Sequence, residues 1–596
     1  MNIFNERLYA LRAKMKEQGV DYYLIPTADF HNSEYVNPYF KVREFMCGFS
    51  GSNGSLVISM DEALLWTDGR YFIQALKQLD GSEYEMMKMA EPGVPTIAEY
   101  LGTKLKNGQT LAFDGRCVNQ AVLEDIKEHF ITPSITIKMD EDMIDSLWSD
   151  RPAMPSTPLF YIPKELAGKT ITEKLTEVKE SLGEHDGVLL SKLDDIMWLY
   201  NIRANDVSCN PVSLAYSYIT KDYATLFIQK NTDKAAALEA LQDAGVILKD
   251  YEDFFMYLSE MNGGEDVLCA KAFTSALVVN TLEKDCKVSF GTNPTEILKA
   301  CKNPVELENI RKFYVQDSAA LTEFIYWIKH NAGKIDLNEY TAAMHLDGMR
   351  AALDGFIELS FPTISGYREN AAMMHYSATE ISNKKIEAEG FLLVDSGGQY
   401  MGATTDVTRT ISLGALTAEE KKHYTLVALG MLELMHAVWL HGCSGRNLDI
   451  LARMRLWKQG IDYKCGTGHG IGYILNVHEG PQNIRWKYTE TMVEAVLEEG
   501  MIVSNEPGVY IENSHGIRIE NIHAIQKDVC TSDGQFMSFD NLTFAPLDRA
   551  AFDLSIMSLE DIARVNAYQK SVYETVSPYL SEDAAKWLFE ECKPLD

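Results

Sequence analysis

Five residues between positions 390 and 525 have the types and the spacing of metal ligands. Each stands in or beside a short apolar, β-branched run, so each is expected to project from a strand or a strand end. They are Asp395 in FLLVDSGGQY, Asp406 in TTDVTRT, His469 in GTGHGIG, Glu506 in SNEPGVY and Glu520 in GIRIENI. Four carboxylates and one imidazole suit a pair of divalent cations. Oxygen donors favour Mn(II), and the imidazole also admits Zn, Co or Fe.

Any one of these acids could be an ordinary surface charge, and the glycines beside them could be ordinary turns. The set is harder to explain in that way, because charged residues are rare within apolar runs such as FLLVD unless they are paired or bind metal. Without a cation, four converging carboxylates would repel one another, and some would stay protonated. Two metals that lie about 3.5–4 Å apart and share carboxylate ligands can hold one hydroxide between them and polarise a carbonyl. The sequence therefore predicts a dinuclear hydrolytic site.

The order of the five motifs, with eleven residues from Asp395 to Asp406, resembles that of the pita-bread metallopeptidases. This group includes methionine aminopeptidase, prolidase and aminopeptidase P. The words TTDVTRT, GTGHGIG, NVHEGP and GIRIEN are most similar to those of aminopeptidase P of the long, three-domain cytosolic type. The likeness extends to SEYVNPYFKVREFMCGFSGSNG and WTDGRYFIQA near the N-terminus, so it covers nearly the whole chain.

The resemblance implies a role for each of the five ligands. Asp395 would bind one metal with both carboxylate oxygens. Asp406 and Glu520 would bridge the pair, since a carboxylate offers two oxygens to two cations. His469 and Glu506 would complete the second metal, and Glu506 would also take the proton from the bridging water.

Five further residues are candidates for the site, and three of them, His478, His375 and Arg70, receive their roles from the same resemblance. His478 would donate to the scissile carbonyl oxygen, and His375 in AAMMHY would contact the peptide and assist proton transfer. A lone histidine is more often structural, so these two roles depend on the family. Arg518 is expected to form an ion pair with a ligand carboxylate behind the metals. Arg409 could do the same or lie on the surface, and Arg70 in TDGRYF would bind substrate.

Two glycine-rich or cysteine-containing features near His469 need separate interpretation. GTGHGIG does not have the spacing of a dinucleotide loop, so its glycines are expected to let the backbone pass close to metals and substrate. Cys465 departs from the family, in which a histidine usually stands four residues before this ligand. It is either a small space-filling thiol or a thiol that lines the active site, where a metal could lower its pKa.

Composition excludes several classes of protein. The chain has 596 residues, 46% of them hydrophobic and 24% charged, which is typical of a globular protein with several domains. Its formal charge of −31 disfavours nucleic acid and anionic membranes as partners. The ten cysteines form no CxxC pair, the N-terminal segment lacks an apolar signal core, and no apolar run could span a bilayer. A cytoplasmic location is expected.

The order of expected helices and strands divides the chain into three domains. Strands alternate with helices over residues 1–150, which predicts an α/β domain. A proline-rich linker follows, and a helix–strand pair that echoes the start of the chain opens a second, related α/β domain at 158–302. Asn303, Pro304 and Glu306 form a helix start that should open the catalytic domain, 303–596. The predicted fold class is α/β (α+β), two related N-terminal domains followed by a pita-bread domain.

The function that follows is a metal-dependent aminopeptidase that removes the first residue from peptides beginning Xaa-Pro. Two divalent ions per chain are expected, with Mn(II) preferred and Zn or Co as alternatives. The alternatives are a prolidase, which would demand a free carboxylate directly after proline, and a non-catalytic pita-bread module that binds peptides. The preference for proline comes wholly from the resemblance, as does a homodimer.

Overall fold

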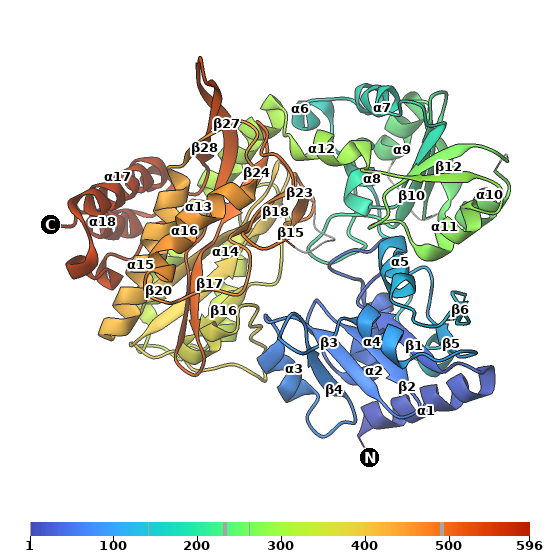
Figure 1. The fold of residues 1–596 in the computed structure, drawn as a ribbon. Coiled ribbons are helices and arrows are strands. Elements are labelled where there is room, and N and C mark those ends of the chain that lie inside the picture. Colours follow the sequence, from blue (N-terminus) through green and yellow to red (C-terminus); the bar gives the residue numbers. More distant parts are fainter. Residues whose placement is uncertain (1, 141, 230–234, 262, 489–493) are drawn as a thin grey trace. The chain divides into compact units, whose positions relative to one another are not determined.

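The computed structural model describes residues 2–140, 142–229, 235–261, 263–488 and 494–596. It divides into two compact units, which are described separately below. The first comprises Met1–Pro163 and Lys169–Glu296, and the second comprises Lys164–Gly168 and Ile297–Asp596 (Figure 1).

The first unit contains two six-stranded sheets, and the earlier one has its first strand near the centre. Its order is β4-β3-β2-β1-β5-β6, with β1, β2 and β3 antiparallel and the other pairings parallel. The strands are β1 (Tyr22–Pro26), β2 (Ser55–Ser59), β3 (Ala63–Thr67), β4 (Glu85–Lys88), β5 (Thr110–Ala112) and β6 (Thr136–Lys138). The helices are α1 (Ile3–Gln18), α2 (Val42–Cys47), α3 (Phe72–Gln78), α4 (Ile97–Lys104) and α5 (Gln120–Glu128).

Alternation along the central strands gives this sheet two buried faces. Tyr23 and Ile25 of β1 pack in one hydrophobic cluster with α1 and α2, whereas Tyr22 and Leu24 pack in another with α4 and α5. Successive side chains of a strand point to opposite faces, so a near-continuous apolar run such as DYYLIP is needed when helices cover both. Helix α1 ends at Gly19, which has φ 65°.

The second sheet of this unit repeats the topology of the first. Its order is β12-β11-β10-β8-β13-β14, with β8, β10 and β11 antiparallel and the outer pairings parallel. The strands are β8 (Gly187–Leu190), β10 (Ala215–Thr220), β11 (Ala224–Ile228), β12 (Ile247–Asp250), β13 (Asp266–Cys269) and β14 (Lys287–Phe290). The helices are α7 (Ile171–Glu180), α8 (Leu193–Leu199), α9 (Ala235–Asp243), α10 (Phe254–Ser259) and α11 (Ala276–Leu282), and β7 (Phe160–Tyr161) pairs with β9 (Ile202–Arg203). The predicted relation between two α/β domains is confirmed.

The second unit is built on antiparallel sheets. The first three-stranded sheet has the order β15 (Phe356–Leu359), β18 (Gly398–Tyr400), β19 (Ala403–Thr404). The other has the order β16 (Ile364–Tyr367), β17 (Phe391–Ser396), β20 (Val407–Ser412). A six-stranded sheet has the order β21 (Val438–Leu440), β28 (Gly534–Asn541), β27 (Asn521–Thr531), β24 (Ile502–Asn505), β22 (Gly468–Gly470), β23 (Glu479–Ile484). A short pair joins β25 (Gly508–Ile511) to β26 (His515–Arg518).

Long helices lie against these sheets, and their starts agree with the sequence signals. Asn303 caps α13 with Pro304 at its first position and Glu306 in a capping box, and Thr417 and Glu420 form the same motif on α15. The helices are α6 (Lys164–Ala167), α12 (Pro294–Ala300, which begins in the first unit), α13 (Pro304–Asn331), α14 (Glu339–Ala351), α15 (Ala418–Met435), α16 (Gly445–Trp457), α17 (Leu559–Val576) and α18 (Glu582–Glu591).

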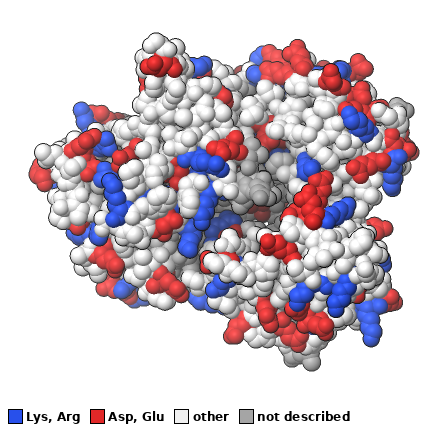
Figure 2. All heavy atoms as spheres, in the orientation of Figure 1, with Lys and Arg blue, Asp and Glu red and all other residues white. Residues whose placement is uncertain are grey.

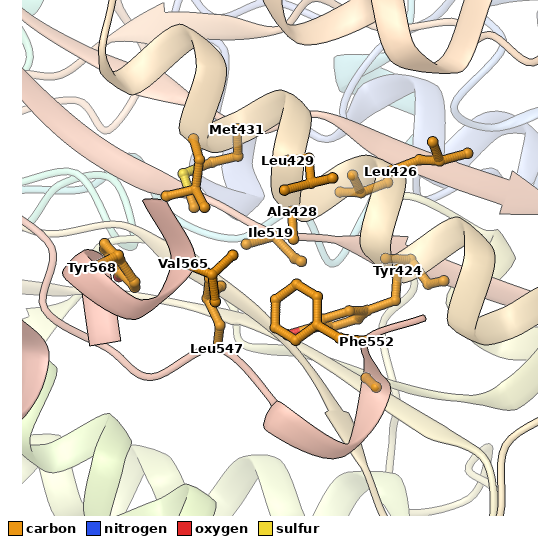
Figure 3. Packing of buried hydrophobic residues seen from close by; sticks show 14 of the residues in the cluster. Tyr424, Leu426, Ala428, Leu429, Met431, Ile519, Leu547, Phe552, Val565 and Tyr568 are labelled. Carbon is orange, nitrogen blue, oxygen red and sulfur yellow. The ribbon is translucent and has the colours of Figure 1, made fainter. Parts of the chain in front are cut away.

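A hydrophobic core in the second unit joins α15 and α17 to β17, which carries Asp395, and to the residue that precedes Glu520. Figure 3 shows side chains of α15 meeting Ile519, Leu547 and Phe552, with Val565 and Tyr568 of α17 beside them. Ile519 is fully buried and directly precedes Glu520. Burying such a side chain contributes about 1.5–3 kcal/mol, so this core also fixes the strand end from which Glu520 projects.

The distribution of charge on the surface is consistent with the acidic composition of the chain. Acidic side chains are spread over the face shown in Figure 2, with basic ones between them. None of the ten cysteines, all of which lie in the described ranges, forms a disulfide. Within the described ranges, no helix combines the length and the apolar character that a bilayer crossing needs.

Candidate dinuclear metal site

Each of the five predicted ligands lies on a strand of the second unit or at the end of one. Asp395 is in β17 and His469 is in β22, whereas the other three follow or precede strands: Asp406 before β20, Glu506 after β24 and Glu520 before β27. Two pairings bring distant strands together, because Asp395 is opposite Thr408 and Asn505 is opposite Asn521. The backbone of Glu520 then joins β20, donating to the Thr408 carbonyl at 3.1 Å.

The donor atoms of Asp406, His469 and Glu520 all lie within 4.8 Å of one another. His469 Nε2 is 3.5 Å from Asp406 Oδ2 and 3.4 Å from Glu506 Oε1. The other ring nitrogen, Nδ1, is 3.0 Å from the Gly470 carbonyl. A donor at Nδ1 leaves a lone pair at Nε2 that faces the carboxylates, which is the arrangement of a metal-binding imidazole.

Arg518 connects two of the four carboxylates, those of Asp395 and Glu506. Its guanidinium donates to Asp395 Oδ2, and its Nε is 4.0 Å from Glu506 Oε2. The same side chain donates to Tyr510 Oη at 2.8 Å and to Thr408 Oγ1 at 3.2 Å. Thr408 in turn donates to Glu520 Oε2 at 2.8 Å. One buried cation therefore orients carboxylates that come from three different strands.

The two further predicted histidines lie at different distances from this cluster. The rings of His469 and His478 meet edge to face with centroids 4.3 Å apart. His375 follows Met374, whose carbonyl accepts from Arg518 at 3.3 Å, so its backbone is near the guanidinium. Both histidines are partly exposed, which leaves them accessible to a ligand.

Burial and mutual repulsion make the carboxyl groups of Asp406, Glu506 and Glu520 difficult to ionise without a cation. Burial raises the pKa of Glu506 to about 7, although the Arg518 guanidinium opposes that shift. Burial and then the charge of Glu520 hold the pKa of Asp406 well above its usual range. Burial and then the charge of Glu506 do the same for Glu520. Bound divalent cations would remove this penalty.

These residues fit a pair of divalent ions. Oxygen donors predominate and one imidazole nitrogen is available, a set that suits Mn(II) and admits Zn or Co. Asp395 Oδ1 is buried and has no hydrogen-bond partner among the described residues, as expected of an oxygen whose partner is an ion.

The structure also gives the surroundings of Arg409 and Arg70, the two arginines whose roles the sequence left least certain. Arg409 is 1% exposed, so it is not a surface residue. Nor does it pair with a ligand carboxylate in the part of the chain that the structure describes. Among the described residues it donates only to neutral acceptors, including the Glu520 carbonyl, Asn521 Oδ1 at 2.8 Å and Tyr568 Oη at 2.8 Å. Arg70 belongs to the first unit and forms a two-point ion pair with Asp68, at 2.9 and 2.8 Å. Its contact with substrate stays a prediction.

Cys465 is partly buried and packs against the hydrophobic core that contains α15 and α17. Its carbonyl accepts from Arg453 at 2.6 Å.

The sequence did not single out the residues that hold the ligands, namely Thr408, Ser504 and Tyr510. Strand alternation could have indicated Thr408, since it is two residues after Asp406, but a hydroxyl in a strand has no specific signature.

A buried histidine behind the site makes acid stability a testable property. His523 is fully buried, and its Nε2 is 3.2 Å from Asn505 Nδ2. Burial, and then the charge of His436, lowers the pKa of His523 to about 3. Between pH 6.5 and about 3, this histidine is protonated in the unfolded chain but neutral in the folded protein. The free energy of unfolding is therefore unaffected by this histidine above pH 6.5 and decreases as the pH falls below that value.

We expect His523→Gln to lose roughly 2 kcal/mol less stability than the wild type between pH 6.5 and 5. Urea unfolding of the metal-free protein at both pH values measures the difference. The exposed His330 provides the control, because His330→Gln should follow the wild type. Equal losses in wild type and His523→Gln would contradict the assignment.

Comparison with known proteins places this site in a family. The model of metallopeptidase family M24 matches residues 308–527, and that of the C-terminal region of the same peptidases matches 535–595. Two models of the creatinase/prolidase N-terminal domain match 7–147 and 150–306. The chain is 38% identical to a probable Xaa-Pro aminopeptidase P of Paracoccidioides lutzii, over 99% of both chains.

This chain belongs to metallopeptidase family M24, with the Xaa-Pro aminopeptidases P. A second M24 relative, a probable Xaa-Pro aminopeptidase P of Sordaria macrospora, is 37% identical over 99% of both chains. An M24 crystal structure, X-prolyl aminopeptidase from Caenorhabditis elegans, is described as a cytosolic enzyme with a di-nuclear active site. It matches with a TM-score of 0.94 and 31% identity over 100% of both chains. The predicted fold class, two related N-terminal α/β domains followed by a pita-bread domain, is thus confirmed.

Proposed function

We propose that this M24 peptidase is a metal-dependent aminopeptidase that releases the N-terminal residue from peptides beginning Xaa-Pro. The observation that carries the proposal is the convergence of four carboxylates and one imidazole at the ends of strands in the second unit. The preference for Xaa-Pro is supported by the full-length likeness to proteins that carry that name.

The proposed ligand set is the one expected from the motifs. Asp395 would hold one metal, Asp406 and Glu520 would bridge the two, and His469 and Glu506 would complete the second. We propose Mn(II) as the physiological ion, because the donors are mostly oxygen. The proposed domain boundaries are 1–150, 158–302 and 303–596.

Two divalent ions at this site would polarise the scissile carbonyl and activate a water for attack. The protein's own groups then move the proton and stabilise the charge. His478 donates an N–H to the carbonyl oxygen as negative charge develops there. Glu506 accepts a proton from the attacking water and passes it to the proline nitrogen as the C–N bond breaks. His375 contacts the bound peptide and helps to hold it in place.

Four further proposals concern the location, a substrate-binding residue, the assembly and the partners. We infer a cytosolic location, since the Caenorhabditis elegans structure is described as a cytosolic enzyme. Arg70 is proposed to bind substrate, and a homodimer is the proposed assembly. Peptides with proline in the second position are the proposed partners.

The test compares a tripeptide Xaa-Pro-Yaa with a dipeptide Xaa-Pro, using enzyme that is stripped of metal and refilled with Mn, Co or Zn. We expect cleavage of the tripeptide after its first residue, restored best by Mn and absent from the metal-free protein. A tripeptide Xaa-Ala-Yaa is the control for proline specificity. Cleavage of the dipeptide alone would instead identify a prolidase. A folded, metal-loaded protein that cleaves neither peptide would indicate a binding module.

A further inference from the structure

A buried polar network joins α16 to the segment that precedes His469. Asp449 and Arg453 stand one turn apart on this helix, both fully buried, with Arg453 Nε 2.6 Å from Asp449 Oδ2. The guanidinium also donates to the carbonyls of Tyr463 and Cys465, at 2.8 and 2.6 Å. It lies over the Tyr463 ring, 3.7 Å from its centroid. A segment without regular structure is thus tied to a rigid helix.

Thr467 closes the network from the other side. Its hydroxyl donates to Asp449 Oδ1, and the Tyr463 hydroxyl is 2.5 Å from the same Thr467 oxygen. Thr467 is fully buried. Asp449 therefore accepts hydrogen bonds from two sides, from Arg453 on its own helix and from Thr467, two residues before His469. Such a connected and satisfied network favours one conformation of the segment over the many open to a loop.

The backbone of Thr467 carries this restraint to a second ligand. Its carbonyl accepts from the Glu506 N–H at 2.8 Å, and its N–H donates to the Ile484 carbonyl at 2.8 Å. Ser504 adds a cross-link, since its hydroxyl accepts from the His469 N–H at 2.9 Å and lies 3.4 Å from Glu506 Oε1.

Gly468 allows these strands to approach closely. A Cβ at this position would lie 2.0 Å from the Ser504 carbonyl oxygen. Since no side chain fits there, Thr467 is the nearest residue before His469 that can anchor the strand through a side chain.

We propose that Asp449, Arg453 and Thr467 are positioning residues for the second metal, because they fix the places of His469 and Glu506. The inference deepens the proposed function and rests on its ligand set. Asp395 is held separately by Arg518 and by its pairings in β16, β17 and β20. Loosening the α16 network is therefore expected to weaken one metal and spare the other. Ligands must be held within about 0.5 Å to bind well, so a small shift suffices.

The decisive variant is Thr467→Val, which keeps the shape of the side chain and removes its hydroxyl. We measure Mn(II) bound per chain against chelator-buffered free Mn(II), together with the melting temperature of the metal-free protein. The expected result is a native affinity for the first ion and about tenfold weaker binding of the second. Thr467→Ser, which retains the hydroxyl, should bind both ions as the wild type does.

The control is Thr322→Val, since Thr322 is also fully buried and donates to a carbonyl, that of Ser318 at 2.7 Å within α13. It should lose stability without changing Mn(II) binding. If Thr467→Val and Thr322→Val bind both ions equally well, the network is merely structural and the inference is overturned. Equal losses in Thr467→Ser and Thr467→Val would also overturn it. A folded wild-type chain that binds no Mn(II) would overturn the proposed metal centre itself, and this inference with it.

Discussion

Replacing Asp406 with asparagine is expected to lower kcat/KM for an Xaa-Pro-Yaa peptide by roughly 10³-fold or more. Asp406 is 4% exposed, and its carboxylate lies among donor atoms of His469 and Glu520. A ligand that bridges two metals must offer one carboxylate oxygen to each of them. An asparagine offers a single neutral oxygen, so it could not bind both metals. Steady-state hydrolysis of the tripeptide at saturating Mn(II) measures the loss.

The same variant should change the stability of the protein in the opposite direction. Burial and the neighbouring carboxylates hold the pKa of Asp406 well above its usual range, so the ionised side chain destabilises the metal-free fold. Asp406→Asn is therefore expected to raise the melting temperature of the metal-free protein and to abolish the further rise that Mn(II) produces. The control is Asp540→Asn, which alters a partly exposed pair with Arg311. Retention of Mn(II)-dependent activity in Asp406→Asn would contradict the proposed bridging role.

Asp317→Asn is expected to lower the free energy of unfolding by about 3–5 kcal/mol, the cost of breaking a buried ion pair. Arg350 is fully buried and donates to both oxygens of Asp317, at 2.8 and 3.0 Å. Tyr400 donates to the same carboxylate at 2.6 Å, and Arg350 also lies 3.4 Å from the carbonyl of Ser396, next to Asp395. The asparagine would leave the guanidinium in the core without the carboxylate to which it donates both hydrogen bonds.

Urea unfolding of the metal-free protein measures this difference. Asp540→Asn is again the matched control, because the pair it alters is half-exposed and should cost at most about 1 kcal/mol. If Asp317→Asn costs no more than Asp540→Asn, Arg350 must find compensation elsewhere and the account of this core is wrong. The location of the pair beside Ser396 leads us to expect that Mn(II) affinity falls as well.

Much of the site could be predicted because its chemistry is local in the sequence. Asp395 and Glu506 stand at the ends of apolar strand-like runs, where an unpaired charge would be costly. The helix start at Asn303 could be predicted for a similar reason, since the cap and its partner Glu306 are only three residues apart. The repeated α/β topology was indicated by a faint helix–strand echo, and the identical strand orders confirm it.

Residues that hold the ligands in place were much harder to find. Thr408 and Glu520 are 112 residues apart. An ion pair of Arg518 with a ligand carboxylate was predicted, but the sequence did not specify Asp395, which is 123 residues away. Arg409 shows the limit most clearly, because an arginine in a strand is more often exposed or paired with an acid. Its burial against backbone carbonyls depends on β20, β27 and α17 meeting, which no local pattern records.

The sequence by itself determined which donors are present, which strands carry them and which family they resemble, because residue type and strand alternation are local properties. Only the tertiary structure decided how the donors meet and what holds them. Strand pairing sets Asp395 opposite Thr408 and Asn505 opposite Asn521, and the buried Arg453 network anchors the segment before His469. These contacts arise from the packing of distant segments, whose energies depend on neighbours that the linear order of residues does not specify.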